Sequence, residues 1–232
     1  MSRNRLVVSE IFGPTFQGEG PSTGKYAHFL RLGGCNLKCV WCDTPYTWDW
    51  SIYDPKKELE KLSADEIYTR LRDLGFNDNL LVITGGEPLL QAEQLYHFIG
   101  DLPLHGYIEI ETAGTVEPLG HEQFVSYNVS PKLANSGNAF DKRRKLDILE
   151  TFAFDYGANF KFVVKNKDDF REIDEIVNTI GISEPQVWIM PEGTSADKIL
   201  AGLRNLEEPV LARGWNLTSR NHVLMHGDKR GV

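Results

Sequence analysis

Short runs of apolar and β-branched residues alternate along the chain with longer segments in which apolar residues recur at helical spacing. This alternation is typical of parallel strands joined by helices, and it does not match the pattern of a β-sandwich. The predicted strands cover residues 28–32, 80–83, 107–110, 124–129, 160–164 and 187–190. The pattern therefore predicts an α/β fold with a mostly parallel sheet.

Three helices have clear boundary signals. Ser63 followed by Glu66 forms a capping box, which predicts that a helix begins here. A second helix is predicted over residues 170–180, where an apolar stripe runs up to a glycine. Ser195 is predicted to cap a third helix, which Pro209 should end or kink because proline lacks a backbone N–H. Residues 136–145 are polar and are predicted to form a mobile loop.

Polar or glycine-rich motifs follow the carboxyl ends of the predicted strands. They are the cysteine segment from residue 35, Thr84-Gly85-Gly86-Glu87-Pro88, Glu111-Thr112-Ala113-Gly114-Thr115, Ser130-Pro131-Lys132 and Met190-Pro191-Glu192-Gly193. In α/β barrels this rim is where sites assemble from separate loops. We expect the motifs to converge, although Gly-Gly-Glu-Pro and Ser-Pro-Lys taken singly are also ordinary turn sequences.

The chain's three cysteines lie close together, as Cys35, Cys39 and Cys42, in a C-x3-C-x2-C pattern with Trp41 before the last thiol. Three thiolates can bind three irons of a [4Fe-4S] cluster and leave the fourth iron open, whereas clusters that only transfer electrons usually have four cysteine ligands. An open iron can bind a substrate or a cofactor.

Zinc and disulfide chemistry are the alternatives for these cysteines. A compact zinc site with a histidine ligand favours a histidine shortly downstream, but the nearest of the six histidines, His28, lies upstream in a predicted strand. A disulfide framework does not fit an odd number of cysteines. The pattern favours an iron-sulfur cluster, and a zinc-stabilised binding module is the alternative from a different functional class.

Composition limits the architecture and the partners. A chain of 232 residues with 41% hydrophobic residues can bury one sizeable core, so we expect a single domain over residues 1–232. The net charge of −8 does not favour broad nucleic-acid binding, and a small-molecule partner is expected. No run reaches the ~18 apolar residues of a membrane span, and reduced thiols fit a cytoplasmic protein.

The cysteine pattern followed by Gly-Gly-Glu-Pro resembles the radical S-adenosylmethionine (SAM) superfamily. Within it, the chain is similar to the 7-carboxy-7-deazaguanine synthase (QueE) family. The matching segments are residues 10–20, 31–37 and 42–44, Glu111-Thr112, Ser130-Pro131-Lys132, residues 161–164 and His222. This resemblance covers most of the chain. It implies a partial, modified TIM-type βα barrel with a cluster-binding loop at residues 33–50.

The resemblance also implies a reaction, in which 6-carboxy-5,6,7,8-tetrahydropterin becomes 7-carboxy-7-deazaguanine with loss of ammonia, for queuosine-type 7-deazapurine biosynthesis. It implies a [4Fe-4S] cluster, S-adenosyl-L-methionine and Mg2+ as cofactors, a one-electron reductant of flavodoxin or ferredoxin type, and a homodimer. Another small radical enzyme, such as an activase of glycyl-radical enzymes, shares the cysteine pattern. It would not explain residues 16–20 or Arg31.

Individual roles on the cofactor side follow from the same resemblance. Cys35, Cys39 and Cys42 would bind the cluster. The residues expected to contact S-adenosylmethionine are Trp41, Gly85, Gly86, Glu87, Glu111, Ser130, Pro131, Lys132, Met190, Pro191, Glu192 and Gly193. The alternatives are a plain core aromatic for Trp41 and a solvated strand end for Glu111.

On the substrate side, Arg31 suits a carboxylate because its planar guanidinium can bind both oxygens, and the alternative is an ordinary surface arginine. Thr44 matches a magnesium ligand of the family, and a hydroxyl oxygen is a suitable hard donor. The residues expected to contact the pterin are Phe16, Gln17, Gly18, Glu19, Arg31, Thr84 and His222.

Three segments depart from the family pattern or have no assigned role. Ala113 stands where many relatives have asparagine. Residues 225–232 differ from relatives in which the last residue reaches the pterin, so no role is assigned to Val232. Residues 46–55, with Trp48 and Trp50, are expected to form a lid or a partner surface.

Overall fold

The computed structural model describes residues 4–101, 107–120 and 125–232, so that Phe124, the predicted first residue of one strand, lies outside the described residues. One sheet of nine strands has the order β3-β1-β2-β4-β5-β6-β7-β8-β9. The strands are β1 (Arg5–Phe16), β2 (Tyr26–Leu32), β3 (Glu60–Ser63), β4 (Leu80–Gly85), β5 (Ile108–Thr112), β6 (Val125–Val129), β7 (Asn159–Val164), β8 (Val187–Pro191) and β9 (Asn216–Leu217).

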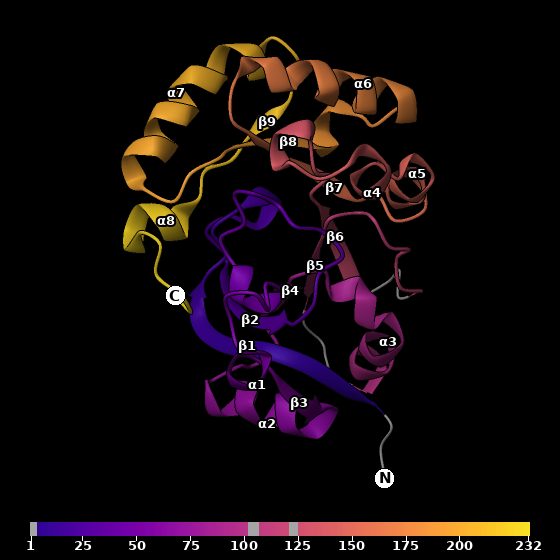
Figure 1. Ribbon diagram of the computed structural model, residues 1–232, viewed down its shortest axis with the longest axis vertical. Coiled ribbons are helices and arrows are strands. Elements are labelled where there is room, and N and C mark those ends of the chain that lie inside the picture. The colour runs from indigo at the N-terminus through magenta and orange to yellow at the C-terminus, as the bar shows by residue number, and fades with distance from the viewer. Residues whose placement is uncertain (1–3, 102–106, 121–124) are drawn as a thin grey trace.

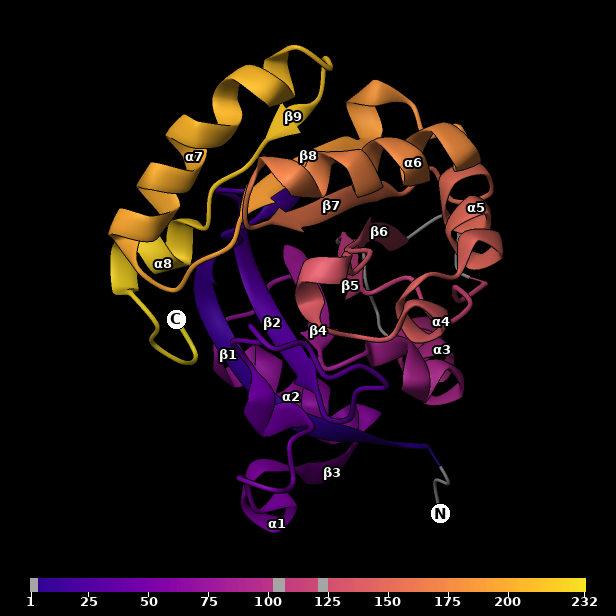
Figure 2. The ribbon, with the colours of Figure 1, turned by 45° about the horizontal axis from the view of Figure 1, so that its top comes forward.

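Neighbouring strands from β2 to β9 are parallel, whereas β1 and β3 add to the β2 edge in antiparallel orientation. The predicted α/β fold and the partial barrel are confirmed, because the sheet is curved and open, with β3 and β9 at its two edges (Figure 1). The helices α2 (Ala64–Asp73), α3 (Ala92–Asp101), α5 (Leu146–Phe154), α6 (Phe170–Ile180) and α7 (Ala196–Leu211) cover the outer face of the sheet and share its apolar core (Figure 2). The shorter helices are α1 (Pro55–Glu58), α4 (Phe140–Arg143) and α8 (Asn221–His226).

All six predicted strands are present, but the pattern missed β1, β3 and β9. β1 contains Gly13 and Pro14 and has register shifts against β2, so it lacks the regular alternation that identifies a strand. β9 has only two residues.

The predicted helix boundaries hold with one exception. Ser63 and Glu66 form the capping box of α2, and Ser195 caps α7 by accepting from the backbone N–H of Lys198. Pro209 does not end α7, which continues to Leu211. Val210, one residue beyond the proline, is buried in the core, and this packing favours the extra half turn.

The alternation of side chains along the parallel strands determines what faces the barrel interior. Ile108 and Ile110 of β5 belong to the core between the sheet and the helices, as do Phe160 and Phe162 of β7. Because side chains alternate between the two faces of a strand, the intervening Glu109, Glu111 and Lys161 point to the inner side. The interior of the barrel is therefore polar at the level of these strands.

Residues 136–145 are not a simple polar loop, because α4 lies within them and Arg143 is buried. Asn138 contacts the cysteine loop directly, so the segment is an ordered part of its surroundings. Within the described ranges, no helix has the length and the apolar content needed to cross a membrane.

Candidate functional site

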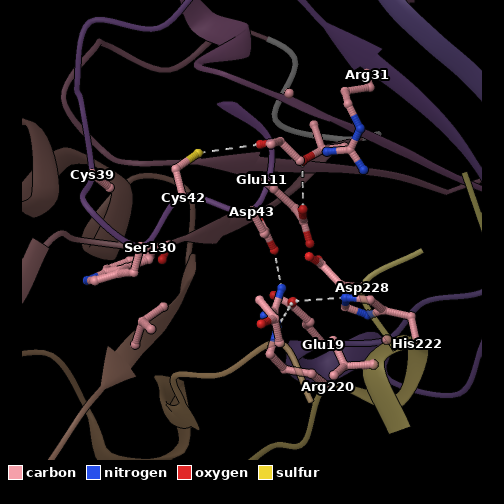
Figure 3. Close-up of a pocket in the computed structure, with 18 of the residues that line it drawn as sticks. Glu19, Arg31, Cys39, Cys42, Asp43, Glu111, Ser130, Arg220, His222 and Asp228 are labelled. Atoms are coloured by element: carbon pink, nitrogen blue, oxygen red, sulfur yellow. Dashed lines mark hydrogen bonds and ion pairs between the residues drawn. The ribbon is translucent and has the colours of Figure 1, made fainter. Parts of the chain in front are cut away.

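A pocket of about 590 Å³ opens at the carboxyl ends of the parallel strands, where the predicted motifs converge. Cys39 and Cys42 lie on one side of it, and Glu19, Arg220 and His222 lie on the other (Figure 3). The predicted site residues that line it are Phe16, Gln17, Gly18, Glu19, Arg31, Cys35, Cys39, Trp41, Cys42, Thr44, Thr84, Gly85, Gly86, Glu111, Ser130, Lys132, Met190, Pro191, Glu192, Gly193 and His222. Glu87 and Pro131 do not line the pocket.

Each cysteine sulfur has an N–H donor. The backbone N–H of Leu37 lies 3.5 Å from Cys35 Sγ, Asn138 Nδ2 lies 3.2 Å from Cys39 Sγ, and Trp48 Nε1 lies 3.3 Å from Cys42 Sγ. Such bonds stabilise thiolates that bind metal. Without a metal, burial raises the pKa of Cys35 to about 12, so this thiol needs a bound cation to become a thiolate.

The geometry does not fit the zinc alternative. A tetrahedral zinc site with bonds near 2.3 Å holds its sulfur atoms about 3.8 Å apart. Among the described residues, a single group of three or more possible ligands has all its donor atoms within 4.8 Å of one another, and this group does not contain the cysteines. At least two of the three cysteine sulfur atoms are therefore more than 4.8 Å apart. His28 is buried elsewhere, where its ring contacts Asn79 and the backbone oxygen of Leu74. The wider spacing fits an iron-sulfur cluster.

Two glycines let the loop after β4 approach the cysteine loop. A Cβ on Gly85 would lie 2.2 Å from the backbone oxygen of Leu32, and one on Gly86 would lie 2.0 Å from the backbone oxygen of Gly34. Any side chain at these positions would push the two loops apart. The turn interpretation of Gly-Gly-Glu-Pro is therefore incomplete, because the glycines are also required by packing.

Glu87 connects two loops and is not among the residues that line the pocket, so its contact with S-adenosylmethionine stays a prediction. Its buried carboxylate accepts from the hydroxyl of Thr112 at 2.8 Å, from the backbone N–H of Ala113 at 2.8 Å and from that of Leu89 at 3.1 Å. Burial raises the pKa of Glu87. This residue therefore fixes the loop after β4 against the loop after β5.

On the cysteine side, Lys132 and Trp41 form a second wall of the pocket. Lys132 Nζ donates to Ser130 Oγ at 2.8 Å and lies 5.8 Å from the centre of the Trp41 ring. The indole N–H of Trp41 donates to the backbone oxygen of Asn135 at 3.1 Å. Trp41 is thus held at the pocket wall and is not a plain core aromatic.

Glu111 lies among the predicted substrate residues, although it was predicted to contact S-adenosylmethionine. Its carboxylate accepts from Gln17 Nε2 at 3.1 Å and from Thr84 Oγ1 at 2.8 Å. Gln17 Nε2 also donates to the buried Glu109 at 2.8 Å. These contacts hold the Glu111 carboxylate at the pocket wall. Glu111 is therefore not simply a solvated residue at the end of a strand.

A charge cluster in which Lys161 and Arg220 are buried forms the far end of the pocket. Glu19 pairs with Lys161 and with Arg220, and Arg220 also pairs with Asp43. Burial raises the pKa of Glu19, but the positive charges of Lys161 and Arg220 outweigh it and hold that pKa well below its usual range. Burial lowers the pKa of His222, which favours the neutral imidazole.

Sequence reasoning did not assign roles to Lys161, Arg220 or Asp43. The alternation Phe160-Lys161-Phe162 was a usable signal, since a lysine between two buried aromatics must face the interior. Arg220 had no comparable signal. Its acidic partners Glu19 and Asp43 come from the opposite end of the chain.

Arg31 shares one carboxylate with the C-terminal tail. Arg31 Nε donates to Glu10 at 2.9 Å, the hydroxyl of Tyr46 donates to the same carboxylate at 3.0 Å, and Arg230 also pairs with it. The Arg230 guanidinium lies 3.7 Å from the centre of the Tyr46 ring. Residues 227–232, beyond α8, reach the pocket beside β1 (Figures 1 and 2), so the divergent C-terminus is part of its wall.

The residues after the cysteine loop pack against it and contribute to the site. Trp48 donates to Cys42, and Tyr46 is buried. Trp50 is exposed. The first part of residues 46–55 is therefore a support for the cysteine loop, and a lid or partner role applies only to its outer part.

The charge cluster also contains possible ligands for a divalent cation. Donor atoms of Glu19, Asp43 and His222 lie within 4.8 Å of one another. Thr44 Oγ1 lies 3.7 Å from Cys42 Sγ, and Thr44 follows Asp43 in the chain. Hydroxyl and carboxylate oxygens suit Mg2+, although Arg220 already pairs with both carboxylates. The donor set fits a cation that takes its other ligands from substrate or water.

Comparison with known proteins agrees with this arrangement. The chain matches the radical SAM superfamily model over residues 30–145. It is 34% identical over 230 residues to the 7-carboxy-7-deazaguanine synthase of Pyrobaculum aerophilum, covering 98% of this chain and 97% of that protein. It is 35% identical to the Bacillus subtilis 7-carboxy-7-deazaguanine synthase, covering 98% of each. The crystal structure of QueE from Escherichia coli aligns with a TM-score of 0.70 and 29% identity over 94% of this chain and 95% of that one. The chain therefore belongs to the 7-carboxy-7-deazaguanine synthase family of radical SAM enzymes.

Proposed function

We propose that this chain, as one radical SAM core domain over residues 1–232, converts 6-carboxy-5,6,7,8-tetrahydropterin to 7-carboxy-7-deazaguanine with loss of ammonia. This reaction belongs to the biosynthesis of 7-deazapurines of the queuosine type. The observation that carries the proposal is that a single pocket has three cysteines at one end and a ring of fixed donors and acceptors at the other. The proposal is supported by two 7-carboxy-7-deazaguanine synthases that this chain matches over nearly their full length.

Cys35, Cys39 and Cys42 would hold a [4Fe-4S] cluster with one open iron for S-adenosylmethionine. When bound, the reduced cluster and S-adenosylmethionine supply a carbon radical that can remove a hydrogen atom from the substrate. The protein's part is to hold the reacting atoms close together and to exclude water.

The part of the pocket wall that would bind S-adenosylmethionine lies around the cysteines. Gly85 and Gly86 line the pocket beside the cysteines, and their backbone amides and carbonyls suit the amino-acid end of S-adenosylmethionine. Lys132 and Ser130 offer polar contacts beside Trp41. The opposite wall is lined by Met190, Pro191, Glu192 and Gly193.

The pterin would bind between Glu111 and the charge cluster. A pterin presents N–H donors next to a carbonyl acceptor, and carboxylates at Glu19 and Glu111 match the donors. Lys161 matches an acceptor. Arg31, whose Nε is held by Glu10, can present its terminal N–H groups to the substrate carboxylate. The neutral form of His222, favoured by burial, can donate or accept.

Thr44 would hold Mg2+ together with substrate oxygens and water. Its hydroxyl lies 3.7 Å from Cys42 Sγ, and the carboxylate of the adjacent residue Asp43 suits the waters around such a cation. A one-electron reductant, a homodimeric assembly and a cytoplasmic location complete the proposal for this chain.

An anaerobic turnover assay tests the function. The protein is reconstituted with iron and sulfide, reduced with dithionite and supplied with S-adenosylmethionine, Mg2+ and the pterin. We expect formation of 7-carboxy-7-deazaguanine, and no product from a Cys39→Ser variant. Cleavage of S-adenosylmethionine by the wild-type protein without ring contraction would contradict the substrate assignment and would favour another radical enzyme.

A further inference from the structure

The carboxylate of Glu10 on β1 holds two neighbouring groups of the pocket with one oxygen atom. Glu10 Oε2 accepts from Arg31 Nε at 2.9 Å and from the hydroxyl of Tyr46 at 3.0 Å. The side chains of Arg31 and Glu10 are only 16% and 14% exposed, and Tyr46 is buried. Burial raises the pKa of Tyr46, so its hydroxyl remains a donor. Tyr46 therefore holds Glu10, and Glu10 in turn holds Arg31.

A second contact fixes the plane of the Arg31 guanidinium. Its central carbon lies 5.6 Å from the centre of the Phe12 ring, and Phe12 stacks on Phe29 with 4.8 Å between the ring centres. Within the described residues, Glu10 is the one hydrogen-bond partner of the Arg31 side chain, and it takes only Nε. The two terminal nitrogens are thus left for a ligand, in an orientation set by Glu10 at one edge and Phe12 at one face.

Tyr46 belongs to the segment that follows the cysteine loop and is fastened to it at two points. The backbone oxygen of Thr47 accepts from the backbone N–H of Gly34 at 2.7 Å, at the start of the loop. Trp48 Nε1 lies 3.3 Å from Cys42 Sγ, at the end of the loop. The place of the Tyr46 hydroxyl therefore depends on the arrangement of the cysteine loop through its next two neighbours.

The cysteine loop has no regular element of its own to fix its shape. Residues 33–44 contain neither helix nor strand. Bonds from Cys35, Cys39 and Cys42 to a cluster would therefore contribute much of the order of this loop, because metal binding is generally coupled to folding of the segment that supplies the ligands. An ordered loop places the Tyr46 hydroxyl against Glu10 and, through Glu10, aligns Arg31.

We propose that Tyr46 and Glu10 are positioning residues through which a cluster at the cysteines strengthens the binding of the substrate carboxylate by Arg31. This inference rests on the proposed function, which assigns the carboxylate of the pterin to Arg31. Coupling between two binding sites is reciprocal, so the pterin should also stabilise the bound cluster. The substrate is then held most tightly by the form of the protein that can start the radical reaction.

Anaerobic calorimetry without S-adenosylmethionine tests this coupling, because binding is then measured without turnover. The Kd for 6-carboxy-5,6,7,8-tetrahydropterin is determined for the reconstituted and for the cluster-free full-length protein. The matched ligand is 5,6,7,8-tetrahydropterin, which lacks the carboxylate. Tyr46→Phe removes the hydroxyl but keeps the ring against which Arg230 packs. The control variant Tyr68→Phe removes a hydroxyl on α2 to which none of the described residues hydrogen-bonds.

We expect the reconstituted wild type to bind the carboxylated pterin about tenfold more tightly than the cluster-free protein. Reconstituted Tyr46→Phe should lose about fivefold in affinity, which is the size of one hydrogen bond. Binding of tetrahydropterin should change in neither comparison, and Tyr68→Phe should behave like the wild type. In an Arg31→Ala background, Tyr46→Phe should have no further effect. Glu10→Gln, which keeps an oxygen acceptor, should bind the carboxylated pterin more tightly than Glu10→Ala.

Equal Kd values for reconstituted Tyr46→Phe and wild type would overturn the proposal. An equal loss of affinity from Tyr46→Phe in the cluster-free protein would also overturn it, because the hydroxyl would then act independently of the cluster. Failure of every form of the protein to bind the carboxylated pterin would instead contradict the proposed function.

Discussion

Arg220 Nε donates to Glu19 Oε1 at 2.8 Å, although the two residues are 201 positions apart in the chain. Arg220 precedes α8, and Glu19 follows β1, so this pair joins the C-terminal part of the chain to the first strand across the pocket. Lys161 on β7 pairs with the same carboxylate. The far wall of the pocket therefore depends on one partly buried acid that balances two buried cations.

Replacing Glu19 with glutamine should destabilise the fold. The variant leaves Lys161 and Arg220 buried without their shared counter-charge, and breaking a buried pair of this kind typically costs about 3 kcal/mol. Urea unfolding of the protein measures the change. The control is Glu66→Gln in the exposed capping box of α2, for which the loss should be about 1 kcal/mol or less. A Glu19→Gln variant as stable as the wild type would contradict the structural role of the pair.

The same carboxylate predicts a pH dependence. The folded pKa of Glu19 lies well below its ordinary value of 4.5, so its ionised form stabilises the folded state. This contribution is complete above the unfolded pKa, near 4.5, and is lost as the pH falls through the lower folded pKa. The free energy of unfolding of the wild type should therefore drop more steeply below pH 4.5 than that of Glu19→Gln. Parallel curves for the two proteins would show that the pair does not control this titration.

The cofactor side of the site was largely predictable from the sequence, and the charge cluster was not. Cys35, Cys39 and Cys42 are close in sequence, and Gly85 and Gly86 follow a strongly apolar strand, so local patterns are enough to place them. Contacts such as Arg220 to Glu19 or Asn138 to Cys39 join distant segments, and no local pattern encodes them.

Polar residues inside the barrel were also hard to predict. Apolar runs such as β4 identify buried strands, but a single Glu109 or Lys161 within such a run reads as an exception unless the inner face is known to be polar. Once the curvature of the sheet is known, alternation assigns these residues to the interior. The contacts of the Glu87 carboxylate with Thr112 and Ala113 were not predictable for a related reason, because its position beside Gly86 does not show which way the carboxylate turns.

Replacing Arg31 with alanine should raise the KM for the pterin about 10- to 100-fold, because a charge-assisted hydrogen bond contributes about 1.5–3 kcal/mol. Iron content and cleavage of S-adenosylmethionine in the absence of pterin should stay near wild type. Arg230→Ala is the matched comparison, because it removes the other arginine on Glu10 from the exposed tail and should have a much smaller effect. Unchanged pterin affinity in Arg31→Ala would rule out the carboxylate contact.

Removal of divalent cations should lower turnover, and Mg2+ should restore it. Thr44→Val, which loses the hydroxyl but keeps the shape, should raise the KM for the pterin and the Mg2+ concentration needed for half-maximal activity about tenfold, in line with the loss of one polar contact. Thr44→Ser keeps the oxygen donor and should behave much more like the wild type. Full activity in EDTA without added metal would count against Thr44 as a ligand.

The N–H donors to the sulfur atoms should tune the reduction potential of the cluster. Trp48→Phe and Asn138→Ala each remove a bond to a cysteine sulfur that stabilises the additional electron of the reduced state, so both should shift the midpoint potential to more negative values. A redox titration followed by electron paramagnetic resonance measures the shift. Asn36→Ala serves as the control within the same loop, because Asn36 contacts Thr115 and no sulfur. An equal potential in all four proteins would contradict this role.

The central claim is that three cysteines at one end of the pocket hold a four-iron cluster whose fourth iron is free to bind S-adenosylmethionine. Electron paramagnetic resonance of the anaerobically reconstituted and reduced protein, recorded with and without S-adenosylmethionine, tests it most directly. We expect a [4Fe-4S] signal whose g values change when S-adenosylmethionine is added. The absence of such a signal, or a signal that S-adenosylmethionine leaves unchanged, would contradict it.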